Sequence, residues 1–126
     1  MGYRVVATED IDEVADRPCE LRRIGSAGEV ENFALNYFRA EPGEQAPLAY
    51  HYHTEQEEAF YVLSGTLFVE TPEETFEVPE GSTFVADPES PHRAHNPEDA
   101  ADAVELLAIG APAVSGDAEA YDPDDE

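Results

Sequence analysis

The sequence predicts one all-β domain, an antiparallel sandwich or barrel that follows a short N-terminal helix. The chain has 126 residues, the length of a single ordinary domain. From Phe33 to Ile109 its hydrophobic residues recur in short runs that suit β-strands, and turns containing Gly and Pro separate these runs. Strands this short and this regularly spaced are typical of antiparallel sheets and not of alternating β/α units.

Residues 8–17 carry the pattern of a short amphipathic helix. Thr8 is a capping residue, acidic residues follow in the first turn, Ile11 and Val14 share one helix face, and Pro18 would end the helix. Beyond this segment the hydrophobic period shortens towards two. This change predicts strands over residues 19–24, 32–40, 49–53, 59–64, 66–70, 75–78, 83–86, 92–95 and 103–109.

The hydrophobic pattern fades after about residue 110. We therefore expect a single domain over residues 1–110, with its core within 33–109, and a disordered acidic tail over 111–126. Six of the last ten residues are acidic, and such a segment has little apolar surface to bury.

The charge balance excludes several classes of partner. The chain has 30 acidic and 6 basic residues, a formal net charge of −24, and every basic residue is an arginine. Nucleic acids and anionic membranes both attract clustered cations, so we expect neither as a partner. The acid excess without lysine is similar to cytoplasmic proteins of salt-accumulating halophiles. Concentrated salt would screen the repulsion between these charges.

The sequence also limits where the protein is targeted and which cysteine chemistry it can carry. The N-terminal residues become acidic before a signal peptide's apolar core could form, and no uncharged apolar run approaches the ~18 residues of a membrane span. Cys19 is the single cysteine, which excludes a disulfide within the chain and a multi-cysteine zinc site. We expect a cytoplasmic protein.

The histidines are placed where a metal site would need them. His51 and His53 are two residues apart, so on a strand both imidazoles point to one face. Glu58 shares the parity of the apolar Phe60, and a carboxylate buried among apolar neighbours calls for a partner or a metal ion. His92 begins a later strand. Taken alone, the His51–His53 pair is more often a pair of surface residues, and the third histidine and the glutamate favour ligation.

Imidazole nitrogens and a carboxylate oxygen suit a divalent transition metal ion. Three histidines and one glutamate would fill four positions of an octahedron and leave two for water, substrate or dioxygen. The sequence does not discriminate among Fe, Mn, Ni, Cu and Zn.

The spacing of these residues resembles the first motif of the cupin superfamily, H-x-H-x(3,4)-E-x(6)-G. His51 and His53 are followed by Glu58 after four residues, and Gly65 then stands in register. Glu57 would fit the shorter spacing but misses the glycine, so Glu58 is the better ligand candidate.

The second cupin motif, G-x(5)-P-x-G-x(2)-H-x(3)-N, is similar to the stretch that begins at Gly81. His92 and Asn96 stand at the motif's positions, whereas Asp87 replaces its proline and Glu89 its second glycine. Both departures lie in the turn before the histidine, so they bear on loop conformation more than on ligation. Asn96 is expected to close a turn through its side chain.

The resemblance covers residues 33–109 and implies a small single-domain cupin of type 2. The implied fold is an antiparallel jelly-roll barrel, or double-stranded β-helix, of six to eight strands with a metal inside. The implied metal ligands are His51, His53, Glu58 and His92, and the implied assembly is a homodimer.

Three functions remain open at this point. The first is a metal-dependent enzyme of the dioxygenase, isomerase or decarboxylase type that acts on a small organic molecule. The second is a non-catalytic module that binds or senses a small-molecule ligand, and the third is a scaffold that has lost its metal. Arg39 and Arg93 are the only basic residues between residues 30 and 110. So few cations disfavour a nucleotide diphosphate as the substrate, because its phosphates would need several. A neutral or weakly anionic molecule that chelates the metal through two oxygens fits better, and no catalytic base is identified.

Overall fold

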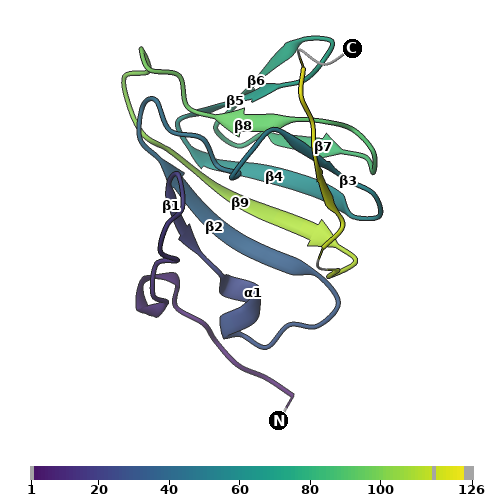
Figure 1. The fold of residues 1–126 in the computed structure, drawn as a ribbon. Coiled ribbons are helices and arrows are strands. Elements are labelled where there is room, and N and C mark those ends of the chain that lie inside the picture. Colours follow the sequence, from purple (N-terminus) through teal and green to yellow (C-terminus); the bar gives the residue numbers. More distant parts are fainter. Residues whose placement is uncertain (1, 115, 124–126) are drawn as a thin grey trace.

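Two layers of antiparallel β-sheet face each other in the computed structural model, which describes residues 2–114 and 116–123. The larger sheet has the order β1-β2-β9-β4-β7 (Figure 1). Its strands are β1 (Glu20–Arg22), β2 (Ala34–Ala40), β9 (Val104–Ala111), β4 (Glu57–Ser64) and β7 (Thr83–Ala86). The predicted all-β fold of antiparallel sheets is confirmed, with strands far apart in the sequence paired side by side.

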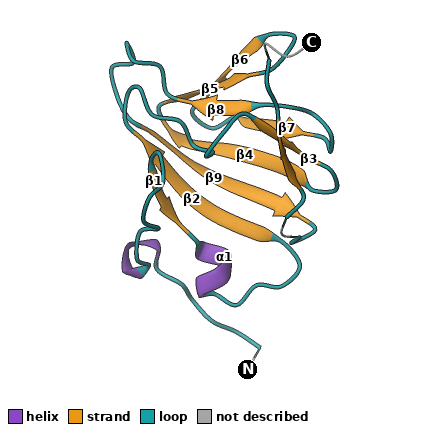
Figure 2. Cartoon of the chain, in the orientation of Figure 1, coloured by secondary structure: helices purple, strands orange, loops and turns teal. Residues whose placement is uncertain are grey.

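The opposite layer has a three-stranded and a two-stranded part. The first, in the order β6-β5-β8, consists of β6 (Thr75–Pro79), β5 (Thr66–Glu70) and β8 (Arg93–His95), and the second pairs β10 (Ala118–Ala120) with β3 (His51–His53). An isolated antiparallel bridge between His51 and His92 joins the two parts. Figure 2 shows that strands and their loops make up most of the chain.

The core lies between the layers and is built from alternate residues of the strands. On β9 the buried positions are Val104, Leu106 and Ala108, and on β5 they are Leu67 and Val69. This alternation places one face of each strand against the opposite layer, so burial of apolar surface holds the two sheets together.

Two glycines of the resemblance occupy turns that require them. Gly65 joins β4 to β5 with φ +79°, and a Cβ there would lie 2.6 Å from the Ala103 carbonyl oxygen. Gly81 precedes β7 with φ +83° and has open space around it. Both conformations are in the left-handed region that favours glycine.

The predicted helix over residues 8–17 is wrong in extent. A 3₁₀ helix, η1, spans only Thr8–Asp10, and a separate helix, α1, spans Ile24–Ala27, beginning at the last residue of the strand predicted over residues 19–24. Tertiary hydrogen bonds replace the helical ones, because the Val14 N–H donates to the Leu21 carbonyl and the Arg22 guanidinium donates to the Ile11 carbonyl. A helix this short has marginal stability on its own, so tertiary contacts determine whether it forms.

The segment after residue 110 also differs from the prediction of a disordered tail. Ala118–Ala120 form β10, which pairs antiparallel with β3, and Tyr121 packs against Tyr50 with ring centroids 5.0 Å apart. Pairing with an open strand edge supplies the order that this acidic segment lacks by itself. Residues 115 and 124–126 of the predicted tail lie outside the described residues. No helix within the described ranges has the length and apolar character that crossing a membrane requires.

Candidate metal centre

The four predicted ligands come from both layers of the fold. His51 and His53 lie on β3, and His92 is held beside them because the backbones of His51 and His92 exchange hydrogen bonds of 3.3 and 2.9 Å. Glu58 projects from β4 in the opposite sheet, flanked across the ladders by the small residues Ala86 and Gly110. The site therefore lies between the layers, at one end of the core.

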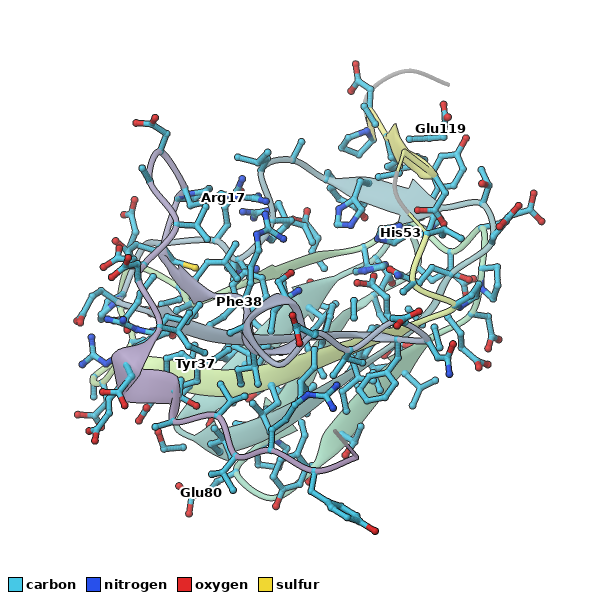
Figure 3. All side chains as sticks on the ribbon, turned by 90° about the horizontal axis from the view of Figure 1, so that it is seen from below. Arg17, Tyr37, Phe38, His53, Glu80 and Glu119 are labelled. Carbon is cyan, nitrogen blue, oxygen red and sulfur yellow. The ribbon has the colours of Figure 1, made fainter. Side chains whose placement is uncertain are left out.

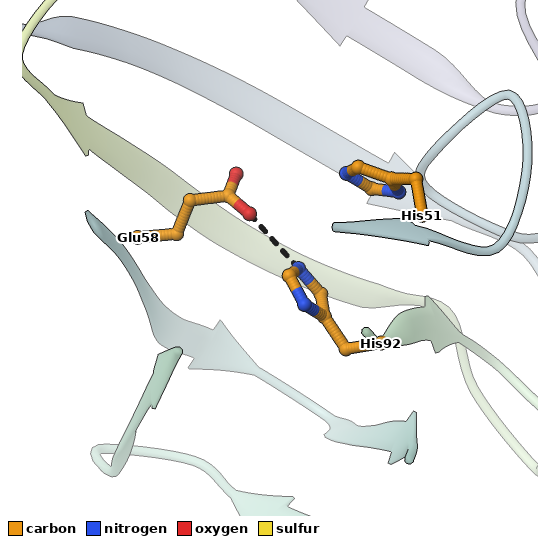
Figure 4. A group of neighbouring side chains, drawn as sticks. All are labelled: His51, Glu58 and His92. Atoms are coloured by element: carbon orange, nitrogen blue, oxygen red, sulfur yellow. Dashed lines mark hydrogen bonds and ion pairs between the residues drawn. The ribbon is translucent and has the colours of Figure 1, made fainter. Parts of the chain in front are cut away.

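The ligand atoms of His51, Glu58 and His92 lie within 4.8 Å of one another (Figure 4). His92 Nε2 is 2.8 Å from Glu58 Oε1, the contact marked by the dashed line. His53 joins from the side, with its Nε2 3.2 Å from His51 Nε2 and 3.3 Å from Glu58 Oε1. The cluster is compatible with a metal site, and exposed Glu57 on the outer face of β4 takes no part in it.

Each imidazole forms a hydrogen bond through Nδ1, on the side of the ring away from the cluster. His51 Nδ1 donates to the Ala49 carbonyl at 2.9 Å, and His92 Nδ1 donates to the Ser90 carbonyl at 2.8 Å. His53 Nδ1 lies 2.9 Å from Asp117 Oδ1. A hydrogen bond at Nδ1 fixes the orientation of each ring, so all three rings direct Nε2 to the centre.

This arrangement fits a cation. The Nε2 atoms of His51 and His53 face each other at 3.2 Å, so a proton or a metal ion must lie between them. The donor set of imidazole nitrogens and one carboxylate oxygen is the set that divalent transition metals accept. The anchored Nδ1 atoms would hold these ligands in place before an ion arrives.

The electrostatics keep a negative charge in the cluster. Burial alone would raise the pKa of Glu58, but hydrogen bonds from His53 and His92 outweigh it and lower that pKa to about 2. The bond to Glu58, opposed by burial and aided by Asp117, raises the pKa of His53 to about 9. Burial lowers the pKa of His51. Glu58 is therefore ionised at neutral pH beside a neutral His51.

Asp117 is a functional residue that the sequence did not identify. Besides holding His53, its Oδ2 accepts hydrogen bonds from the backbone N–H groups of Glu55 (3.3 Å) and Gln56 (3.0 Å). It thereby fixes the loop between β3 and β4 and the ring of one ligand together. Its position in an acidic tail gave no signal of this role.

A partly open cavity of about 410 Å³ adjoins the cluster. Its walls are mainly apolar and include Phe38, Leu48 and Phe60. Residues from both ends of the chain complete the lining, among them Arg17 near the N-terminus and Glu119 on β10 (Figure 3). Arg17 was predicted to lie on a helix, so nothing in the sequence placed it here.

Asn96 has the structural role that was predicted. Its side chain is 2% exposed, and Nδ2 donates to the carbonyls of Ala40 (3.1 Å) and Asp102 (2.9 Å). These bonds tie the turn after β8 to the ends of β2 and of the loop before β9. Asn96 is therefore a support of the barrel and not a ligand.

The comparison with protein families decides the classification. The sequence pattern of the family described as "Cupin domain" (Cupin_2) matches residues 36–110, which is more than half of the chain. This chain belongs to the cupin family. The matched region contains every ligand candidate and both motif glycines of this cupin, whereas Arg17 and Asp117 lie outside it.

Solved structures with the same fold include several cupins. A sugar phosphate isomerase of the cupin superfamily from Silicibacter pomeroyi is 24% identical with a TM-score of 0.72, covering 86% of this chain and 75% of that one. A predicted oxalate decarboxylase from Thermotoga maritima is 17% identical with a TM-score of 0.71, covering 86% and 99%.

A putative sugar phosphate isomerase from Acidithiobacillus ferrooxidans is 24% identical with a TM-score of 0.66, covering 74% of this chain. The cupin described here spans only 58% of that protein's length. At these identities the likeness concerns the fold. None of the curated proteins matches the chain.

Proposed function

We propose that this cupin binds one divalent transition metal ion through His51, His53, Glu58 and His92 and uses it as a metal-dependent enzyme on a small organic molecule. The observation that carries the proposal is the shared orientation of the three imidazoles, each anchored at Nδ1 and turned inward at Nε2. Scattered surface histidines would have no reason to direct one ring nitrogen each to a common centre.

The chain's own residues would hold and orient the reactants. When bound, the ion would act as a Lewis acid on substrate oxygens. The apolar walls of the cavity would exclude water from the bound carbon skeleton, and Glu58 would offset part of the ion's charge. Isomerases and a decarboxylase among the similar structures support two of the reaction classes, and the dioxygenase class stays open.

A non-catalytic binding or sensing cupin is the second candidate. One observation favours it: among the described residues that line the cavity, Glu119 is the one carboxylate outside the ligand cluster, and it is exposed. A reaction that needs a separate buried general base would therefore lack one.

Metal binding is tested first. Metal-free protein in molar KCl is titrated with Fe²⁺, Mn²⁺, Ni²⁺, Cu²⁺ and Zn²⁺ by calorimetry, and metal content is measured after gel filtration. We expect one equivalent in the wild type and in Glu57→Gln, and loss of that equivalent in Glu58→Gln. Equal metal content in the two variants would contradict the assigned register.

Turnover then separates the two candidates. The metal-loaded protein is incubated with a panel of small hydroxy and keto acids, and oxygen uptake and products are followed. Conversion that disappears in His51→Ala supports the enzyme. Saturable binding without conversion supports the binding module.

A further inference from the structure

Arg17 is an unpaired cation in a chain with a large excess of acid. Within the described residues its guanidinium forms no hydrogen bond or ion pair, although 30 residues of the chain are acidic. Arg4 donates to backbone carbonyls, and three further arginines pair with glutamates: Arg22 with Glu20, Arg39 with Glu41 and Arg93 with Glu70. The Arg23 side chain also lacks a hydrogen bond or ion pair among the described residues, so the missing carboxylate gains meaning only where the position of the arginine gives a reason for it.

The position of Arg17 supplies that reason, because its side chain lines the cavity beside the metal cluster. Its backbone is held on both sides: Asp16 has a left-handed φ of 61°, and Pro18 restricts the residue before it. Cys19, two residues on, is 5% exposed and belongs to the hydrophobic core. Arg17 is thus half-buried at the cavity wall, on a backbone that its neighbours restrain.

The surroundings of Arg17 leave its positive charge uncompensated. Burial, and then repulsion from Arg23, lower the pKa of Arg17, and no carboxylate acts against them. Arginine stays protonated even so. Partial burial of a cation without a partner costs free energy, which an anionic ligand would return.

We propose that Arg17 binds the carboxylate of a small organic acid whose remaining oxygen atoms reach the metal ion. This inference rests on the proposed function, and of the neutral or weakly anionic molecules that the sequence favours it selects an anionic one. A guanidinium accepts a carboxylate through two parallel hydrogen bonds. The apolar side chains of Phe38 and Phe60 would contact the carbon skeleton between the two polar ends. A cavity of about 410 Å³ suits a small molecule.

One arginine favours a carboxylate over a phosphate. Arg17 is the one lysine or arginine among the described residues of the lining, and Glu119 opposes additional negative charge. A doubly charged phosphate would be left with half of its charge unpaired. Arg17 also lies outside residues 36–110, so it belongs to this chain and not to the pattern shared by the family.

Matched probes test the proposal on the metal-loaded protein in molar KCl. Each probe carries a hydroxamate to chelate the metal and, across a two-carbon spacer, a carboxylate, a carboxamide or a phosphonate. Calorimetry measures the dissociation constants for wild type, Arg17→Gln and Arg23→Gln. Arg23 is the control because it carries the same charge nearby but does not line the cavity.

We expect the carboxylate probe to bind the wild type at least about tenfold more tightly than the carboxamide probe. Arg17→Gln should abolish that preference without changing carboxamide binding, and Arg23→Gln should retain it. Equal binding of both probes by the wild type, or a preference that survives in Arg17→Gln, overturns the inference alone. A stronger preference for phosphonate overturns the carboxylate assignment. Failure to load metal or to bind any hydroxamate overturns the proposed function and, with it, this inference.

Discussion

The cavity has two kinds of wall, and they differ in origin. The strand wall, made of β3, β4 and the residue before β8, lies within residues 36–110 and supplies all four ligand candidates. The terminal wall, made of residues near Arg17 and of the segment from Asp117 to β10, lies outside that range. In the proposed function the strand wall would hold the ion, whereas the terminal wall would orient His53 and present the charge of Arg17 to the substrate. Under this proposal, the metal chemistry and the choice of substrate would reside in separable parts of the chain.

The largest effect is expected from removing a ligand of the strand wall. His92 is 2% exposed and contacts Glu58 at 2.8 Å, so His92→Ala should lower metal affinity more than about 100-fold. His95→Ala is the control, because His95 packs near Phe68 away from the cluster. Calorimetry gives the affinities and circular dichroism checks the β-sheet. Metal binding that survives His92→Ala in a folded protein would count against the assignment.

Asp117 tests whether the terminal wall supports the metal. Asp117→Asn removes the negative partner of His53 Nδ1, and we expect metal affinity to fall about 10- to 100-fold. Glu119→Gln removes the same charge from the adjoining strand without breaking a described hydrogen bond, so it should leave the affinity nearly unchanged. Equal losses in the two variants would mean that net charge alone, and no specific contact, is responsible.

The motif glycines test whether the strand wall depends on its turns. Gly65→Ala should cost about 2 kcal/mol or more of unfolding free energy, because the new Cβ meets the Ala103 carbonyl oxygen as well as an unfavourable φ. Gly81→Ala has the same sign of φ but open space, so it should cost about 1 kcal/mol. Urea denaturation in molar KCl measures both. A Gly81 variant as unstable as the Gly65 variant would exclude the contact with Ala103 as the cause.

The smallest effect concerns how stably the N-terminal segment around Arg17 and Cys19 packs against the core. Burial, followed by the charge of Glu44, raises the pKa of the Cys19 thiol from 9.0 to about 12. A raised pKa means that the unfolded thiol ionises first, so stability should decline between pH 9 and about 12 and not below pH 9. At pH 8.5 iodoacetamide should alkylate the native protein far more slowly than the urea-unfolded protein. Similar rates would show that residues near Arg17 leave the core readily.

The two walls also differ in how many of their residues could be predicted from the sequence. The ligand set follows from strand parity and fixed spacing: His51 and His53 face one way, and Glu58 shares the buried face of Phe60. The alternation of buried and exposed residues in the strands follows this local sequence pattern. The strand predictions consequently match the observed strands within a few residues. Asn96 as a turn residue was likewise predictable from its own side-chain chemistry.

The terminal wall depends on contacts that no local pattern encodes. Asp117 reaches His53 across 64 positions of the chain, and β10 exists because β3 offers it an edge. The predicted helix near Arg17 gave way to hydrogen bonds with β1 and its neighbours. Long-range pairings of this kind override weak local propensity, which is why the helix is shorter than predicted and why a strand forms within the segment predicted as a disordered tail.

The most direct test of the account is anomalous diffraction from crystals of the metal-loaded protein, recorded at the absorption edge of the bound metal. The account predicts one strong peak about 2.0–2.3 Å from Nε2 of His51, His53 and His92 and from the Glu58 carboxylate. A peak held by surface carboxylates elsewhere, or these four side chains in place around no peak in protein loaded with excess metal, would contradict it.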